Sequence, residues 1–260
     1  MIPAQKSNHP DIDFMSLVSH QLSTPLAAVR WYAEILRKGE MAQPLDATQA
    51  EFVNEILGGA ARMGELVDDM LNASRLERDK FTDDPIPTAM AKIVEQQIEQ
   101  LEAESSLKKI KVSLDLEPDL PDITARPSVL RMIVQNLLFN AIKYSEDGGS
   151  VSMKLRMAGD TEAAKLTHRP PEKAIFFSVS DTGLGIPQSQ QDNVFTKFFR
   201  ADNVRAKGIS GTGLGLYIVA TAVAKQAGAV WFESTEHQGS NFFVVLPVKN
   251  HSDKQEPVLK

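Results

Sequence analysis

The sequence predicts two domains: an all-α helical hairpin that forms a homodimeric four-helix bundle, followed by an α+β sandwich. The first observation is length, because 260 residues exceed one ordinary domain. The second is a helical spacing of apolar residues in two stretches up to about residue 78, with no proline between Pro44 and Pro85. The third is a change of pattern after that break, where helical and alternating segments mix and six of the 15 glycines fall within residues 183–215.

The first domain reads as two amphipathic helices joined by the segment KGEMAQPLD. Two helices alone bury one apolar stripe against each other and leave the flanking apolar positions in water. We therefore expect a second copy of the chain to complete a four-helix bundle. The alternative is that the hairpin docks on the chain's own C-terminal domain. The stripes consist of Phe14, Leu17, Val18, Leu22, Leu26, Val29, Ala33 and Leu36 in the first helix, and of Phe52, Ile56, Gly59, Met63, Leu66, Met70 and Ala73 in the second.

The second domain alternates between helical and strand patterns, which is typical of helices laid on one face of a mixed sheet. Residues 158–173 are polar and contain proline, and they are predicted to form a long loop between paired strands. The residues after Val248 are predicted to be a disordered tail. Helices are expected over 90–105, 125–145 and 212–228, and strands over 110–116, 150–157, 174–181, 229–234 and 240–248.

Composition excludes several classes of protein and of site. With 42% apolar and 24% charged residues the chain is soluble and globular rather than disordered, collagenous or held by disulfides. The absence of cysteine excludes thiolate zinc sites and cysteine nucleophiles, and the five histidines have no zinc-ligand spacing. A net charge of -6 argues against nucleic acid as a partner, and no segment reaches the ~20 apolar residues of a membrane span. We expect no nucleic-acid contact and no membrane contact by this chain.

Four polar side chains share one edge of the helix predicted at NLLFNAIKY. Asn136, Asn140, Lys143 and Tyr144 are separated by four, three and one residues. Asparagine is unfavourable inside a helix, and amides placed among leucines need hydrogen-bond partners. A bound phosphate or a hydrated Mg2+ would supply them. The alternative is a helix packed over a loop whose carbonyls accept these bonds.

The segment FFSVSDTGLGIP places Asp181 at the end of a strand, directly before Gly183 and Gly185. The glycines let backbone approach a planar ligand closely, and the carboxylate can accept a hydrogen bond from the amino group of a base. D-T-G is also the triplet of aspartic proteases, which need two such loops; this chain has one, and a homodimer would supply the second. A further alternative is a tight turn capped by Asp181.

Three alternating glycines in GTGLGLYIV come immediately before the last predicted helix. Gly211, Gly213 and Gly215 leave backbone amides at a helix N-terminus, where they attract phosphate. The pattern is not a Rossmann G-x-G-x-x-G, because Leu216 follows Gly215, and it is not a P-loop. The preceding segment, VFTKFFRADNVRAKGIS, has the polar composition of a mobile lid.

One histidine, His20, lies in an apolar helical stripe at FMSLVSHQLSTPLAAV. Thr24 shares its face at i+4, and Pro25 inside a helix removes a backbone amide at a cost of about 3 kcal/mol. Such a locally unfavourable choice indicates function. The pattern leaves equally open that Thr24 caps a new helix with Pro25 at its first position.

These four blocks, in this order, resemble a bacterial-type sensor histidine kinase of the H-x-x-x-T-P class over about residues 11–248. The resemblance implies a linker (1–10), a dimerisation and histidine-phosphotransfer domain (11–80), a Bergerat-type ATP-binding domain (81–248) and a disordered tail (249–260). It implies an enzyme that phosphorylates itself with ATP and Mg2+ and passes the phosphoryl group to an aspartate of a separate response-regulator receiver protein. Its implied location is cytoplasmic, as a whole protein or as the cytoplasmic part of a membrane-anchored sensor.

The resemblance also implies roles for single residues. His20 would be the phosphoacceptor, and Asn140 would hold Mg2+ against the phosphates. Lys143 would neutralise phosphate, Tyr144 would stack near adenine, and Asp181 would accept the adenine amino group. Arg200 would reach the γ-phosphate. The other expected nucleotide contacts are Asn136, Gly183, Gly185, Ile186, Phe195, Phe198, Gly211, Thr212, Gly213, Leu214, Gly215 and Leu216.

The chain departs from the family pattern beside the histidine. The family commonly has a carboxylate there and a basic residue two positions further on, where this chain has Gln21 and Ser23. Gln21 cannot take a proton, but it can orient the imidazole, and Thr24 could orient a water that hydrolyses the phosphoaspartate. A flexible stretch at about 76–85 is expected to let the domains meet. Two alternatives stay open. One is an ATPase of the same superfamily, although such ATPases lack the HQLSTPL hairpin that this chain has. The other is a nucleotide-binding dimeric scaffold without kinase activity.

Overall fold

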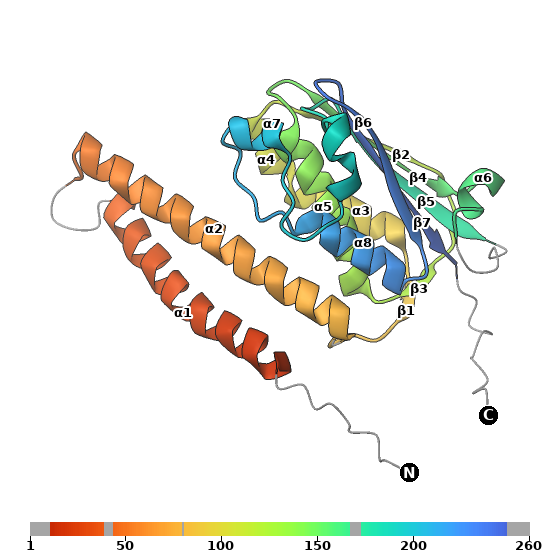
Figure 1. Ribbon diagram of the computed structural model, residues 1–260, viewed down its shortest axis with the longest axis horizontal. Helices are drawn as coiled ribbons and strands as arrows, with labels where there is room; N and C mark the ends of the chain where they lie inside the picture. The colour runs from red at the N-terminus through yellow and green to blue at the C-terminus, as the bar shows by residue number, and fades with distance from the viewer. Residues whose placement is uncertain (1–10, 39–43, 80, 167–172, 249–260) are drawn as a thin grey trace, which may run out of the picture. The chain divides into compact units, whose positions relative to one another are not determined.

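The computed structural model describes residues 11–38, 44–79, 81–166 and 173–248, and for residues 11–21 it describes only the backbone. The chain forms two compact units (Figure 1). One comprises the chain up to Arg78 together with Ser210–Thr212, and the other comprises the rest from Asp79 onward. No helix within these ranges is long and apolar enough to cross a membrane.

The first unit is the predicted helical hairpin. It pairs α1 (Asp11–Lys38) with α2 (Ala47–Arg78), and α1 continues through Pro25, which answers the question that the sequence left open. The start of α2 is capped reciprocally, because Gln49 N–H donates to Asp46 Oδ1 at 2.8 Å and Asp46 N–H donates to Gln49 Oε1 at 3.0 Å.

The apolar stripe that α2 buries is adjacent to the predicted one. Val53, Ala60 and Val67 are buried at intervals of seven residues, as expected for one face of a helix along a partner. Most of the predicted stripe is exposed, including Ile56 at 48% and Met63 at 50%. The heptad prediction is therefore correct in period, but the hairpin itself uses the neighbouring face.

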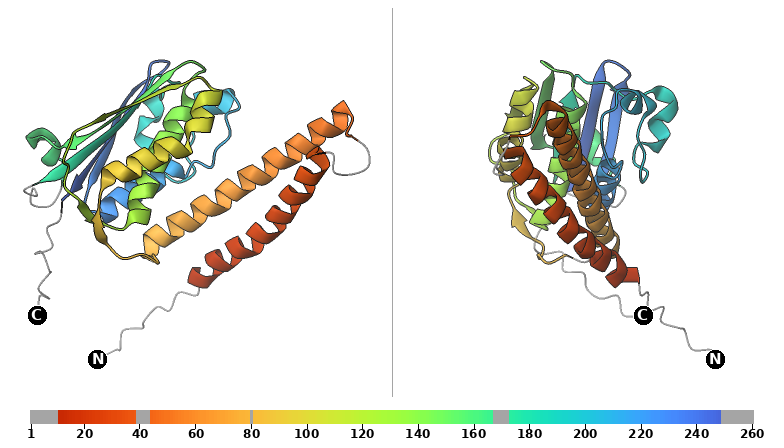
Figure 2. Two further views of the ribbon diagram at one scale, coloured as in Figure 1. Left: turned by 180° about the vertical axis from the view of Figure 1, so that it is seen from behind. Right: turned by 90° about the vertical axis from the view of Figure 1, so that its left-hand side faces the viewer.

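The second unit is a sandwich of helices over one sheet, as predicted (Figure 2). Its five strands lie in the order β2-β4-β5-β7-β6, where β2 and β4 are parallel and the other neighbours are antiparallel. The helices α3, α5 and α8 cover one face, and the alternating residues of β4 and β5 that point to them form the core. The main elements are α3 (Met90–Gln100), β2 (Lys111–Leu116), α5 (Pro127–Tyr144), β4 (Ser150–Met157), β5 (Ala174–Asp181), α8 (Gly215–Lys225), β6 (Ala229–Thr235) and β7 (Gly239–Pro247).

Several short elements were not predicted. A two-stranded antiparallel sheet joins β1 (Ile86–Thr88) to β3 (Ile123–Ala125), and α4 (Glu102–Leu107) is separated from α3 at Leu101. A 3-10 helix, η1 (Gln188–Asn193), directly precedes the predicted lid, and the lid itself contains α7 (Asp202–Ala206). These pieces are too short for periodicity to reveal them.

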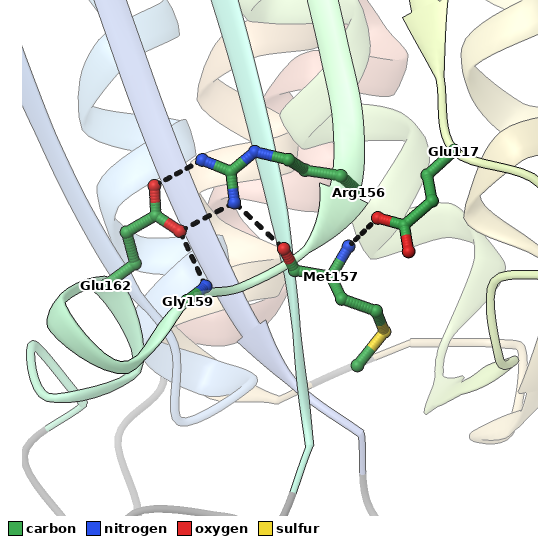
Figure 3. Close-up of polar contacts among 5 residues, drawn as sticks. All are labelled: Glu117, Arg156, Met157, Gly159 and Glu162. Carbon is green, nitrogen blue, oxygen red and sulfur yellow. Dashed lines mark hydrogen bonds and ion pairs between the residues drawn. The ribbon is translucent and has the colours of Figure 1, made fainter.

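The predicted loop after β4 also contains a short helix, α6 (Asp160–Ala163). Arg156 holds it with two hydrogen bonds to Glu162, of 2.8 and 2.5 Å (Figure 3). The Arg156 guanidinium also lies 4.1 Å from the Phe176 ring centroid. On the other side Met157 N–H donates to Glu117 Oε2 at 2.8 Å. The long-loop prediction is wrong for the start of this segment; residues 167–172 of it, like the predicted tail, lie outside the described residues.

Candidate functional site

Asp181, at the end of β5, is a buried carboxylate held by backbone amides. Its Oδ1 accepts hydrogen bonds from Gly183 N–H at 2.8 Å and from Ser240 N–H at 3.3 Å. Burial raises the pKa of Asp181 to about 6, although these two hydrogen bonds lower it. The carboxyl group is thus fixed in position and is still ionised at neutral pH, as an acceptor for a ligand amino group must be.

The two glycines after Asp181 lie where no side chain fits. A Cβ at Gly183 would be 2.4 Å from the Tyr144 carbonyl oxygen, and one at Gly185 would be 1.9 Å from the Thr235 carbonyl oxygen. Gly185 also has φ of +59°, which favours glycine. These glycines bring the Asp181 loop against the backbone of both α5 and the β6-β7 hairpin, while the predicted approach to a planar ligand stays a prediction.

The two asparagines of α5 face the start of α8. A Cβ at Gly215 would lie 2.7 Å from Asn136 Oδ1 and 3.7 Å from Asn140 Nδ2. Both side chains are half-buried, and Asn136 Nδ2 donates to the Met132 carbonyl one turn earlier at 2.8 Å. The asparagine and glycine motifs, 75 residues apart between Asn140 and Gly215, meet at this point.

The last turn of α5 carries Lys143 and Tyr144. Lys143 Nζ lies 4.9 Å from the Phe139 ring centroid. Tyr144 packs against the buried cluster of Leu184, Ala201 and Val204. Burial raises the pKa of Tyr144, although the nearby charge of Arg200 lowers it. Tyr144 therefore connects α5 to the lid segment through apolar contact.

The lid segment between the two glycine motifs is anchored to β6 by Phe195, and Arg200 makes a hydrogen bond within the segment. The Phe195 ring meets Phe232 of β6 edge-on, with centroids 5.7 Å apart, while Phe198 is exposed with φ of 61°. Arg200 donates to the Ile209 carbonyl, and its buried Nε has no hydrogen-bond partner among the described residues. The Arg200 guanidinium thus makes its hydrogen bond to another residue of the lid segment, Ile209.

The helix α8 begins at Gly215, and Leu214 at its N-cap is buried. Gly213 has φ of +74°, and a Cβ there would lie 2.6 Å from the Phe198 carbonyl carbon. Leu216, in the first turn of α8, is half-buried. Gly211 and Thr212 fall in the short segment that groups with the hairpin unit.

The residues predicted for phosphoryl chemistry lie on the other unit. His20 and Gln21 are in the continuous helix α1, and their side chains lie outside the described residues. Thr24, one turn later, is exposed. Apart from Gly211 and Thr212, the residues predicted to contact nucleotide thus lie on one unit, and the candidate phosphoacceptor lies on the other.

Sequence reasoning missed the β6-β7 hairpin as part of the site. Ser234 accepts a hydrogen bond from Ile186 N–H at 2.9 Å, and Ser240 N–H reaches Asp181. Between them Gly239 has φ of +101°, and a Cβ there would lie 2.0 Å from the Asp181 carbonyl oxygen. The glycine of HQGSN was the one available signal, because a glycine directly before a strand indicates a close backbone approach.

The comparisons with known proteins agree with this division. Residues 12–79 match the family of His Kinase A phospho-acceptor domains, and residues 125–250 match that of histidine kinase-, DNA gyrase B- and HSP90-like ATPases. The circadian input-output histidine kinase CikA of Synechococcus elongatus is 33% identical over 256 residues, which are 98% of this chain and 32% of that protein. The histidine-protein kinase BarA of Escherichia coli is 30% identical over 92% of this chain and 25% of its own length. The chain therefore spans about a third or less of these relatives.

Solved structures give the same picture. Full-length ShkA in complex with AMPPNP matches with a TM-score of 0.67 and 26% identity, over 90% of this chain and 45% of that chain. The histidine kinase AdeS of Acinetobacter baumannii shares the fold, with a TM-score of 0.57 and 18% identity over 89% of this chain and 98% of that chain. Since a phospho-acceptor match covers the hairpin that carries His20 and an ATPase match covers the unit that carries Asp181, this chain belongs to the sensor histidine kinases, as a catalytic core.

Proposed function

We propose that this chain transfers the γ-phosphoryl group of ATP to His20 and then to an aspartate of a response-regulator receiver protein. The observation that carries the proposal is that the C-terminal half of α5 contacts both other motifs of the proposed nucleotide site. Asn136 faces Gly215 of the phosphate-side loop, and the Tyr144 carbonyl accepts from Leu184 N–H at 3.2 Å in the Asp181 loop. The C-terminal half of α5 thus joins the loop of the proposed base-recognition carboxylate to the amides at the N-terminus of α8.

The residues fit a nucleotide in two halves. Asp181 would accept the adenine amino group, with Ile186 in the loop beside it, and the amides at the start of α8 would face phosphate. Asn140, with its carboxamide near Gly215, suits Mg2+, which keeps several waters and takes most of its other oxygens from substrate phosphates. When bound, Mg2+ would offset negative charge on the phosphates. Lys143 and Arg200 would supply further positive charge, Arg200 after release from the Ile209 carbonyl.

The chemistry requires a neutral imidazole. A nitrogen lone pair of His20 would attack the γ-phosphorus in line; the N–P bond forms as the bond to the β,γ-bridging oxygen breaks, and ADP leaves with that electron pair. The imidazolium proton is then lost to solvent or a base, and Gln21 would orient the ring without accepting that proton. The phosphoryl group would pass from the histidine to an aspartate of the receiver. Thr24 would orient water for the later hydrolysis of that phosphoaspartate.

The exposed apolar residues of the hairpin support the homodimer. On α1, Leu22, Val29 and Leu36 are exposed at intervals of seven residues, and on α2 so are Ile56 and Met63. Such stripes, left in water by a single hairpin, are the pattern that a four-helix bundle covers. Because ATP and receiver proteins are cytoplasmic, we place the chain's activity in the cytoplasm.

Incubation with γ-labelled ATP and Mg2+ tests the proposal. We expect label that is stable to alkali and lost in acid, as for phosphohistidine, and that moves to a receiver protein when one is added. His20→Ala should abolish the label while leaving nucleotide affinity within about twofold, because acceptor and nucleotide motifs lie on separate units. A scaffold without kinase activity would bind ATP and take no label, and a superfamily ATPase would release phosphate equally well without His20.

A further inference from the structure

The segment that follows Asp181 is held by backbone hydrogen bonds at Leu184, where the Tyr144 carbonyl accepts and His237 N–H donates, and by side-chain hydrogen bonds further along, at Gly185 and Ile186. Within the described residues, 182–187 belong to neither of the sheets. Their backbone groups nevertheless need hydrogen-bond partners, because the segment is largely buried. Ile186 N–H donates to Ser234 Oγ at 2.9 Å, and the Gly185 carbonyl accepts from Asn203 Nδ2 at 3.1 Å.

Gln191 joins this segment to the β6-β7 hairpin through a single amide group. Its Nε2 donates to the Ile186 carbonyl and to the Ser234 carbonyl, each at 3.0 Å. Ile186 and Ser234 are 48 residues apart in the sequence. The two hydrogens of the Gln191 amide therefore link two distant backbone segments. The hydrogen bond that Ile186 N–H donates to the Ser234 hydroxyl connects the same two segments a second time.

The link continues to Asp181. The Ser234 hydroxyl has one hydrogen, and its acceptors within reach are the Gly239 carbonyl at 3.1 Å and Ser240 Oγ at 2.9 Å. Ser240 N–H in turn donates to Asp181 Oδ1. The Gly185 backbone also packs directly against the Thr235 carbonyl, where a Cβ would overlap the oxygen, so the loop and the hairpin are in close contact.

We infer that Gln191 is a positioning residue for nucleotide binding, which holds the Gly185–Ile186 segment against the β6-β7 hairpin so that the loop beside Asp181 is preformed. This inference rests on the proposed function, in which that loop takes the adenine. Loss of the two hydrogen bonds that the Gln191 side chain donates lowers the fraction of molecules in which the loop is correctly placed. The apparent affinity for nucleotide falls by the same factor. Once nucleotide is bound the loop is in place again. Gln191 therefore acts on KM and not on kcat.

The test replaces Gln191 with leucine, which keeps most of the volume and removes both donors. We expect the Kd for AMPPNP, measured by calorimetry, to rise about tenfold, since two net hydrogen bonds of about 0.5–1.5 kcal/mol each are lost. The KM for ATP in self-labelling should rise similarly, with the rate at saturating ATP within about twofold of the original chain. The matched control is Gln188→Leu, an exposed glutamine of the same 3-10 helix, which should change neither.

An unchanged Kd in folded Gln191→Leu, or a fall in kcat at constant KM, overturns the inference. If that variant does not fold, Ser234→Ala decides, because it removes the other half of the link and should also raise Kd and KM alone. Combining the two substitutions should weaken binding little more than the worse single one, whereas full multiplication of their effects overturns the shared link. If the chain binds AMPPNP but labels no histidine, only the proposed function is contradicted. The Kd values for AMPPNP of the original chain and of Gln191→Leu then still test the role of Gln191. A chain that binds no nucleotide overturns both.

Discussion

Asp83 caps the helix α5 from a distance of 45 residues along the chain: Ser128 N–H donates to its Oδ2 at 3.0 Å, and the Ser128 hydroxyl donates to its Oδ1 at 2.7 Å. Arg126, the residue at the N-cap position, makes no capping bond with its side chain. Instead its Nε donates to the Asp83 carbonyl at 3.0 Å, and its guanidinium lies 5.3 Å from the Phe81 ring centroid. Of the stretch that was expected to be flexible, about 76–85, Phe81 and Asp83 are thus attached to the second unit, so the expected range is too wide.

Asp83→Ala should destabilise the second unit by about 1 kcal/mol, because an N-terminal cap and a favourable charge at the helix start are lost. Partial burial raises the pKa of Asp83, but the hydrogen bonds from Ser128 and the charge of Arg126 outweigh it and leave the pKa below its ordinary value. Its stabilising effect is therefore present above about pH 4 and lost as pH falls below that.

Urea unfolding at pH 7 and at pH 3 measures this effect. The control is Asp84→Ala, which changes the exposed neighbouring carboxylate. Equal unfolding free energies for Asp83→Ala and Asp84→Ala at pH 7 would show that the cap contributes nothing.

Asp181→Asn should raise stability and lower nucleotide affinity together. Burial raises the pKa of Asp181 from 3.8 to about 6, so its contribution to stability is present below pH 4 and is lost as pH rises through about 6. The amide does not ionise and avoids that loss, which is worth up to about 3 kcal/mol at pH 8. With its oxygen on the amides of Gly183 and Ser240, the new side chain turns an NH2 group toward the position proposed for the adenine amino group.

Thermal unfolding without nucleotide should show a higher Tm for Asp181→Asn at pH 8 and no difference at pH 4. AMPPNP affinity should fall at least about tenfold at pH 8, and that of the unaltered chain should fall as pH drops below about 6. The control is Asp192→Asn, an exposed carboxylate in η1. Unchanged affinity in Asp181→Asn would remove this carboxylate from base recognition.

Ile56→Lys should dissociate the dimer, because it places an ammonium group in the apolar stripe that the second hairpin would cover. An unpaired buried charge costs several kcal/mol, so the dimerisation constant should weaken roughly a hundredfold. Asn54→Lys puts the same charge almost opposite on α2, at a position that is already exposed and polar, and should leave the dimer intact. Light scattering that finds both variants equally dimeric would contradict the bundle.

The sequence could predict those helices and strands in which the spacing of apolar residues itself indicates the secondary structure. The helix α5 and the five strands of the main sheet follow from spacing, and so do the asparagine and glycine motifs that meet at Gly215. The face of α2 was misjudged because Phe52 and Val53 are both apolar, and only the position of α1 shows which of them is covered: Val53 is buried and Phe52 is exposed. Gln191 and Ser234 carry no periodic signal at all. Their role depends on contacts across 43 residues that no local pattern encodes.

Gln21→Glu addresses the departure beside the predicted phosphoacceptor. If the Gln21 amide only orients His20, a carboxylate in its place adds a proton acceptor and stabilises the developing imidazolium. The initial rate of self-labelling should then rise about tenfold or more, since a well-placed general base contributes 10²–10⁴-fold. Gln21→Ala, which removes the orienting group without adding a base, should lower it.

The same variant separates a slow kinase from one that favours dephosphorylation of its receiver. If Gln21 favours hydrolysis through Thr24, Gln21→Glu should raise self-labelling and reduce the loss of label from a phosphorylated receiver, whereas Thr24→Ala should reduce that loss without raising self-labelling. Both activities are measured with the same labelled receiver, so a change in stability alone would lower them together. Labelling of Gln21→Glu at or below the original rate would show that the proton leaves by another route, and that glutamine at this position does not weaken the kinase.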